Sequence, residues 1–168
     1  VAEKEVKADL AVWPINVRAA GDNLDEANRT ADAARKKVLA FLAENGIPTS
    51  DIASQTSRVS DRQALDYVQA QARQALRYVV VYTILVRSKA VDRVKQVSQM
   101  TDKLVSAGVI ISATNPQFLF TQLNAVKPAM LADATRAARE AASQFAGDSG
   151  SKVASIRRAT QGLFSISD

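Results

Sequence analysis

The nine-residue run YVVVYTILV, at positions 78–86, constrains the fold of this chain more than any other stretch. Its β-branched and aromatic residues favour a strand. Both alternating sets of positions are apolar, which is typical of a central strand in a sheet. The run is about half as long as the ~20 residues that cross a bilayer as a helix. We therefore interpret it as a buried core strand.

The most distinct helix is predicted soon after the first strand. It starts at Asn23, which can cap it together with Glu26 three residues later. It stops at Gly46, which an apolar Ile47 follows. Its buried face should hold the apolar residues at helical spacing, which are Leu24, Ala27, Ala31, Ala34, Val38 and Leu42.

Two more helices are predicted further along the chain. The second follows Ser88 as its cap, ends at Gly108 and buries a stripe of Val91, Val94, Val97, Thr101 and Leu104. The third carries Pro128 in its first turn, where proline is tolerated. It stops at Gly147, which we expect in the left-handed conformation. Its small residues would allow close packing on a sheet, along a face of Met130, Ala134, Ala138, Ala141 and Phe145.

Prolines interrupt the pattern of two predicted strands, and a further strand is predicted at the end of the chain. The first segment alternates, but its phase changes near Pro14, which cannot donate to a ladder. This predicts a bulge, bend or edge position there. Residues 109–122 should form a strand interrupted at Asn115 and Pro116. A last strand is predicted from alternation after residue 151, with Val153, Ile156, Gly162, Phe164 and Ile166.

The segment between the first helix and the central strand is polar. Residues 51–62 predict a weak strand with Ile52 and Val59 as its apolar members, and no proline blocks its pairing. It is our candidate for an open sheet edge. Residues 63–75 fit either a hairpin tip or one short helical turn, and both alternatives stay open.

These elements follow the order β-α-β-β-α-β-α-β. Such an order predicts the α+β class, a mainly antiparallel sheet with three helices packed on it. The chain has 168 residues, of which 47% are apolar, enough for one core. We therefore expect residues 1–168 to form a single domain.

The composition removes several classes of chemistry. There is no histidine and no cysteine, so histidine acid–base catalysis, disulfides and thiolate metal sites are excluded. The net charge of +5 is mild and dispersed, whereas nucleic-acid binding needs a basic face with stacking aromatics. We expect no nucleic-acid partner and no cofactor. We assign no catalytic, cofactor-binding or metal-binding residue, and any ligand-binding residues stay unknown.

The stretch AGDSGS, at positions 146–151, contains the Gly-Asp-Ser-Gly run of chymotrypsin-like proteases. A serine needs an adjacent base to become a nucleophile, and the triad base is histidine. A dyad of Ser149 with Lys152 is the remaining alternative, but nothing in the sequence buries Lys152. The neighbouring residues are turn formers, so we interpret the stretch as a connection from helix to strand.

Two other groups of residues are candidate sites. Trp13, Tyr67 and Tyr82 are the aromatic candidates for a ligand cleft, although such residues more often belong to the core. The carboxylates at residues 22–26 offer a third hypothesis, a hydrolase without histidine, but negative charge is favourable at a helix start in any case.

Several stretches resemble a known family. KADLAVWPI at the start, LRYVV before the central strand, SAGVIIS after the second helix and, most specifically, residues 121–166 are similar to bacterial SIMPL-domain proteins. The resemblance covers nearly the whole chain and comes closest to exported or membrane-anchored members of unknown function. It implies no catalytic residues.

The resemblance also implies a location and a way of acting. It implies a periplasmic or membrane-anchored protein whose N-terminal signal or anchor is absent here. Members often have one more C-terminal strand, and whether this chain lacks it is left open. Our hypothesis is a non-enzymatic, extracytoplasmic homo-oligomer that acts as a scaffold or protects against oxidative stress. The alternative is a periplasmic binding module for a small ligand or protein partner. Proline at Ile52 or Val59 should weaken the oligomer.

Overall fold

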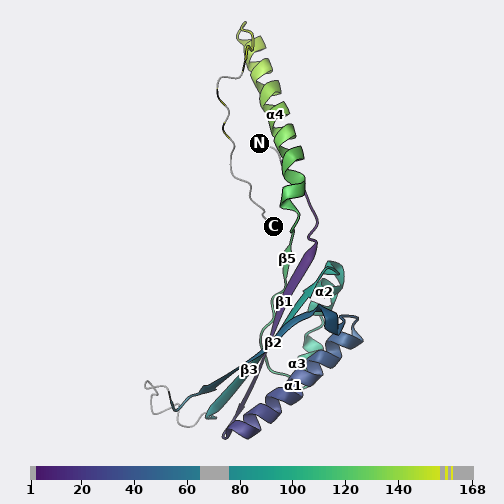
Figure 1. Cartoon of the computed structure of the whole chain (residues 1–168), viewed down its shortest axis with the longest axis vertical. Coiled ribbons are helices and arrows are strands. Elements are labelled where there is room, and N and C mark those ends of the chain that lie inside the picture. Colours follow the sequence, from purple (N-terminus) through teal and green to yellow (C-terminus); the bar gives the residue numbers. More distant parts are fainter. Residues whose placement is uncertain (1–2, 65–75, 156–157, 159, 161–168) are drawn as a thin grey trace. The chain divides into compact units, whose positions relative to one another are not determined.

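The computed structural model describes residues 3–64, 76–155, 158 and 160. The chain divides into two compact units, one of Val6–Thr121 and one that joins Val1–Glu5 to Gln122–Asp168. In its described part, the first unit holds a sheet with helices on it, and the second holds a long helix (Figure 1). This division does not test the single domain expected for residues 1–168, which stays a prediction.

The first unit is built on an antiparallel sheet, which confirms the predicted α+β class. The strands run in the order β2-β3-β1-β4, and β5 also pairs with β1. The run at 78–86 lies in β3, between β2 and β1, so its predicted central position is confirmed. The strands are β1 (Leu10–Gly21), β2 (Ile52–Asp61), β3 (Tyr78–Ser88), β4 (Ile111–Ala113) and β5 (Gln117–Leu119).

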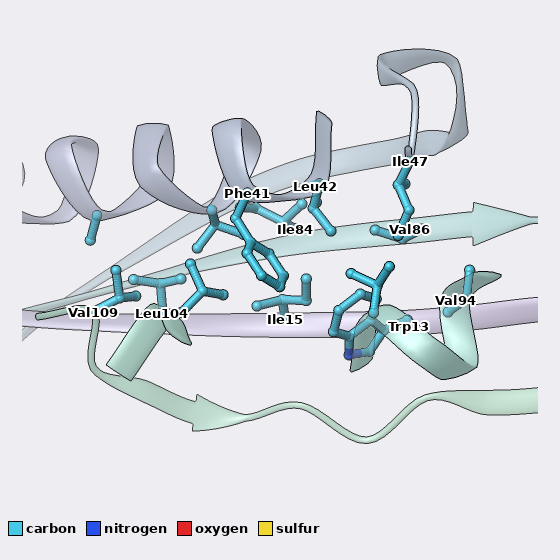
Figure 2. Close-up of a cluster of buried hydrophobic side chains, with 14 of the residues drawn as sticks. Trp13, Ile15, Phe41, Leu42, Ile47, Ile84, Val86, Val94, Leu104 and Val109 are labelled. Atoms are coloured by element: carbon cyan, nitrogen blue, oxygen red, sulfur yellow. The ribbon is translucent and has the colours of Figure 1, made fainter. Parts of the chain in front are cut away.

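Helices of this unit pack on one face of the sheet. They are α1 (Leu24–Glu44), α2 (Val91–Ser98) and α3 (Asp102–Ser106), and a 3-10 turn (Thr49–Asp51) precedes β2. Alternate residues of β1 point toward them and are fully buried, and helix residues join these strand residues in one cluster (Figure 2). The largest members are Trp13, Ile15, Phe41, Leu42, Ile47 and Ile84.

The predicted limits of the first helix are confirmed. The Oδ1 of Asn23 accepts a hydrogen bond of 2.8 Å from the backbone N–H of Glu26. At the other end Gly46 has φ +79°, and the N–H of Ile47 donates to the Leu42 carbonyl at 2.9 Å. This is a glycine-terminated helix end whose following residue, Ile47, is buried in the core.

Most of the predicted buried face of α1 is also confirmed. Leu24 is the exception, because it is the first helical residue and is 43% exposed. Phe41 is buried although the spacing did not single it out. Toward its N-terminus α1 packs with alanines, and a Cβ on Gly21 would lie 2.9 Å from the Ala27 nitrogen. Small residues therefore let this end of the helix approach β1 closely.

The second predicted helix is wrong in its continuity. It is broken into α2 and α3 between Ser98 and Asp102. The hydroxyls of Ser98 and Thr101 donate to the carbonyls of Lys95 and Ser98, at 2.9 and 3.3 Å. Such side-chain bonds compete with the helical backbone pattern. The predicted buried residues Val94, Val97 and Leu104 are confirmed.

Of the predicted ends of this helical segment, the start at Ser88 is wrong and the stop at Gly108 is confirmed. Ser88 is not the N-cap, because α2 begins at Val91; its buried Oγ instead accepts from the Ala90 N–H at 3.1 Å. The stop at Gly108 is confirmed, since Gly108 has φ +80°. The N–H of Val109 donates to the Leu104 carbonyl at 3.0 Å, and Val109 joins the core.

The pairing of β1 with β3 has no bulge at Pro14, although the pairing of β1 with β4 shifts in register between Asn16 and Val17; an edge-like position of Pro14 is right. The register of β1 with β3 continues unbroken through Pro14, which pairs with Leu85. On its other side β1 pairs with β5 at residues 10–12 and with β4 at residues 16 and 17. Pro14 lies between these two short partners, so its missing N–H removes no ladder bond there.

Backbone direction supports this explanation. The N–H of Arg18 donates to the Ile110 carbonyl at 2.8 Å, and alternate strand residues direct their N–H groups to the same side. The nitrogen of Pro14 therefore faces the β4 and β5 side. The change of phase occurs earlier, between Leu10 and Ala11, which are both buried. The predicted interruption at Asn115 and Pro116 is confirmed, because it separates β4 from β5.

The second unit contains α4 (Leu123–Asp148). The helix begins earlier than predicted, so Pro128 lies inside it and not in its first turn. Of the α4 residues, Ala146 alone is buried, and Phe145 is 77% exposed. The expectation that α4 packs on the sheet concerns the placement of the two units and stays a prediction.

Some expectations fall wholly or partly outside the described residues. Residues 151–155 adopt no strand, so the start of the predicted last strand is wrong. Ile156, Gly162, Phe164 and Ile166 lie outside the described residues, as do Tyr67 and residues 65–75, where a hairpin tip or a helical turn was left open.

Candidate functional site

The protease-like stretch ends helix α4. The hydroxyl of Ser149 donates to the Ala146 carbonyl at 3.2 Å, and its N–H donates to the Phe145 carbonyl at 3.1 Å. Ser149 is the C-cap of the helix, and Lys152 is exposed. The contacts of Ser149 are those of a helix terminus, which supports the interpretation from sequence.

The glycine of this helix end was assigned to the wrong position. Gly147 is helical, and Gly150 has φ +70° instead. The N–H of Ser151 donates to the Ala146 carbonyl at 2.7 Å, and the N–H of Gly150 donates to the Gly147 carbonyl at 3.2 Å. This pair of bonds needs the left-handed residue directly after the cap. The helix ends at Asp148, one residue beyond the predicted stop at Gly147, and Ser149 is its C-cap.

The three aromatic candidates are not brought together in one cleft. Trp13 is fully buried in the core, and its Nε1 donates to the Oγ1 of Thr114 at 2.8 Å. Tyr82, on β3, is half-buried and lines a surface groove. Tyr67 lies outside the described residues.

The groove beside Tyr82 lies along α1. It has a volume of about 460 Å³ and is open to solvent. In β2, Ser57 pairs with Tyr82, so the edge strand runs next to the groove. The helix supplies the other lining residues, which are Asn28, Arg29, Asp32, Ala33 and Lys36.

A charged side chain joins α1 to β2 near this groove. The guanidinium of Arg35 donates to Gln55 Oε1 at 3.0 Å and to Asp32 Oδ1 at 2.6 Å. Its carbon lies 5.8 Å from the centroid of the Tyr82 ring. Hydrogen bonds from Lys36 and Arg35 hold the pKa of Asp32 below its ordinary value. This carboxylate therefore stays ionised and serves as an ion-pair partner.

A second ion pair lies at the C-terminal end of β2. The guanidinium of Arg77 contacts Asp61, with Nη2 at 2.8 Å from Oδ2, and it lies 4.9 Å from the centroid of the Tyr78 ring. The hydrogen bond from Arg77 lowers the pKa of Asp61. Catalytic acids need the opposite shift, so neither Asp32 nor Asp61 has the electrostatics of a general acid.

On the opposite side of α1 lies a basic groove. It has a volume of about 380 Å³, and Gly108 and Ile110 form part of its wall. Lys37 reaches across it, since its Nζ donates to the Ala107 carbonyl at 2.7 Å. Arg29 is paired with Asp25 at 3.2 Å. Lys37 and Arg29 thus have partners within the protein, and the backbone N–H of Arg18 donates to the Ile110 carbonyl at 2.8 Å.

The edge strand β2 is the most accessible feature of the sheet. Among the described strands it pairs with β3 alone and stands at the end of the strand order, which agrees with its predicted edge position. Its sequence, IASQTSRVSD, contains no proline, and Val59 is 47% exposed. A strand of this kind presents outward N–H and C=O groups to any further strand.

The described residues provide neither a cluster of metal ligands nor a membrane-spanning helix. Among the described residues no group of acidic side chains is arranged to hold a metal ion. The carboxylates of residues 22–26 lie at the start of α1, where Asp25 and Glu26 occupy the first turn. No helix in the described part of the chain is long and apolar enough to cross a membrane.

Sequence reasoning missed the link from α1 to the edge strand. Asp32, Arg35 and Lys36 are spaced as neighbours on a helix, and that signal was available. The contact of Arg35 with Gln55 joins α1 to β2 between residues 20 positions apart in the chain, and no local pattern indicates it.

The comparisons with known proteins identify the family. The family model described as SIMPL, a protein of unknown function (DUF541), matches residues 1–166. The comparison with curated proteins gave no match. The match spans both compact units and includes the residues on which the resemblance rested. The chain therefore belongs to the SIMPL (DUF541) family.

Proposed function

We propose that this chain is a non-enzymatic, extracytoplasmic protein that self-associates and acts as a scaffold or in protection against stress. The observation that carries the proposal is the open edge of β2, which ends the strand order and has no proline. Identical chains are the nearest partners for such an edge. The extracytoplasmic location and the stress role rest on the resemblance to exported family members.

The chemistry of the described residues supports the absence of an enzymatic role. The hydroxyl of Ser149 is used in a helix end, and the pKa values of Asp32 and Asp61 are lowered by their cationic partners. The charges of α1 are largely paired with each other. We expect neither a cofactor nor a nucleic-acid partner.

The alternative is a binding module. The groove along α1 favours it, because Tyr82 offers a half-buried aromatic surface with Asp32 and Lys36 beside it. Its solvent-open form suits a protein segment better than a small molecule, since small-molecule sites enclose most of their ligand.

The experiment is the solution mass of the chain by light scattering over a range of concentrations. We expect a mass above that of the 18.0 kDa monomer. Val59→Pro should lower it, whereas Val59→Thr, which keeps the N–H, should not. Ile52→Pro is a poorer variant than the sequence suggested, because the Ile52 N–H donates to the Thr49 carbonyl within the chain. A wild-type monomer at every concentration would favour the binding module.

A further inference from the structure

The backbone direction of β2 can be derived from one hydrogen bond. The N–H of Arg62 donates to the carbonyl of Arg77 at 2.9 Å, and the register of β2 with β3 is continuous from Ser54 to Asp61. In an antiparallel pair, alternate residues direct their N–H and C=O groups to the same side. The even-numbered residues therefore face β3. The odd-numbered residues face away from it, and these are Gln55, Ser57, Val59 and Asp61.

We propose that two copies of this chain pair antiparallel through β2 in one register, with Val59 opposite Val59 of the second copy. The inference rests on the proposed self-association and specifies its interface. A two-fold axis makes one residue of the strand pair with itself. The choice among registers is therefore a choice of that central residue.

Charge excludes several registers. With Arg58 at the centre, two guanidinium groups would stand directly opposite each other, and with Asp61 at the centre, two carboxylates would. With Ser60 at the centre, Arg58 would oppose Arg62. Like charges directly opposite each other destabilise a strand pair. With Thr56 at the centre, the ladder would instead reach the irregular start of β2 between Ile52 and Ser54, next to the 3-10 turn.

The other registers differ in which residues Val59 contacts and in whether the ladder uses the regular part of β2. The register of β2 with β3 shifts between Ile52 and Ser54, so centres at Ser54 or Gln55 would place the new ladder on this irregular part. A centre at Ser57 pairs Val59 with Gln55, whereas a centre at Val59 pairs the two valines. The register centred on Val59 also pairs Ser57 with Asp61 and Arg58 with Ser60, so no like charges stand opposite each other.

The same register suits the burial pattern. Val59 pairs with Val80 within the chain, and Val80 is fully buried beneath α1. Paired residues share a face of the sheet, so Val59 lies on the helix-covered face beside the apolar cluster. It is nevertheless 47% exposed. A second Val59 opposite it would extend this cluster across the two-fold axis.

Within β2 this register pairs residues 57–61 of the two copies, and so short a pairing buries less surface than a standard interface. Weak association is best trapped covalently, and the chain has no native cysteine to interfere. In a hydrogen-bonded antiparallel pair the two Cα atoms lie about 5.5 Å apart, within the range for a disulfide. Two Ser57 residues would be about 14 Å apart along the strands in the same dimer, which is too far for a disulfide.

The test is oxidative cross-linking of single-cysteine variants, read as covalent dimer on a non-reducing gel. We expect Val59→Cys to form a covalent dimer, and Ser57→Cys to form no more than Glu26→Cys, an exposed control on α1. A mixture of Arg58→Cys and Ser60→Cys proteins should cross-link as the heterodimer, because those residues oppose each other across the axis.

The outcomes separate this inference from the proposed function. A covalent dimer with Ser57→Cys instead of Val59→Cys would overturn the register while self-association stands. An oligomer by light scattering with no cross-link at any β2 position would place the interface elsewhere and overturn the inference. A wild-type monomer would overturn both.

Discussion

The indole nitrogen of Trp13 donates a hydrogen bond to the hydroxyl of Thr114 at 2.8 Å, across 101 positions of sequence. Trp13 is fully buried in β1, and Thr114 lies in the interruption between β4 and β5. The bond satisfies the one polar atom of the largest core side chain. It also holds the interruption against the central part of the sheet.

Thr114→Val should therefore destabilise the first unit by about 1–3 kcal/mol, because a buried N–H loses its acceptor. Thr114→Ser keeps the hydroxyl and should cost much less. Urea unfolding followed by tryptophan fluorescence measures both variants, since Trp13 is the only tryptophan. Equal stabilities for the two variants would show that the bond contributes nothing.

Gly150 and Gly147 should respond in opposite directions to alanine. Gly150→Ala places a Cβ on a residue with φ +70° and should cost about 1 kcal/mol at the end of α4. Gly147→Ala adds a methyl group to a helical residue with open space around it and should stabilise the helix by about 0.5–1 kcal/mol. Hydrogen exchange of the amides at 145–151 reports both effects. A loss of protection with Gly147→Ala would contradict the assignment.

The ion pair of Asp61 with Arg77 predicts a pH dependence. The pKa of Asp61 is lowered in the folded state, so its contribution is present above the unfolded-state pKa of about 3.9. It is lost as the pH falls through the lower folded-state pKa. Asp61→Asn should thus reduce stability near neutral pH and converge with wild type in acid.

Arg77→Gln provides the matched variant for that prediction. The two single variants and the double variant form a cycle whose coupling should be present at neutral pH and disappear in acid, as the pH falls through the lowered pKa of Asp61. Thermal unfolding at several pH values gives the coupling. A coupling that is constant with pH would rule out the ion pair as its source.

Ser149 should be inert toward serine-directed reagents. Its hydroxyl is bonded to the Ala146 carbonyl, and the chain has no histidine to act as its base. A fluorophosphonate probe should label wild type and Ser149→Ala equally weakly. Labelling that disappears in the alanine variant would sink the structural interpretation of this serine.

The sequence predicted those features that depend on neighbours along the chain. Both ends of α1 follow from Asn23 and Gly46, because caps involve residues within one turn. The central position of β3 follows from its two apolar faces. The break between α2 and α3 was missed because helical spacing continued through it, while the hydroxyls of Ser98 and Thr101 bond locally to the backbone.

The candidate site was less predictable than the fold. The edge position of β2 followed from its polar composition and agrees with the order of the strands that the structure describes. The contacts of Arg35 with Gln55 and of Trp13 with Thr114 join residues far apart in the chain. Such pairs depend on which strands become neighbours, and a single sequence without a sheet order cannot supply that.

Pro14 has a consequence for folding fidelity. Its nitrogen faces the space between two short neighbours, where no donor is required. If β1 slipped by two residues against β5 or β4, the proline would replace a residue whose N–H can donate, at a cost of about one hydrogen bond, or ~1 kcal/mol. Misaligned sheets would then be roughly fivefold less populated for this reason alone. Pro14, although unfavourable in most inner strands, thus favours the native register of β1 over registers shifted by two residues.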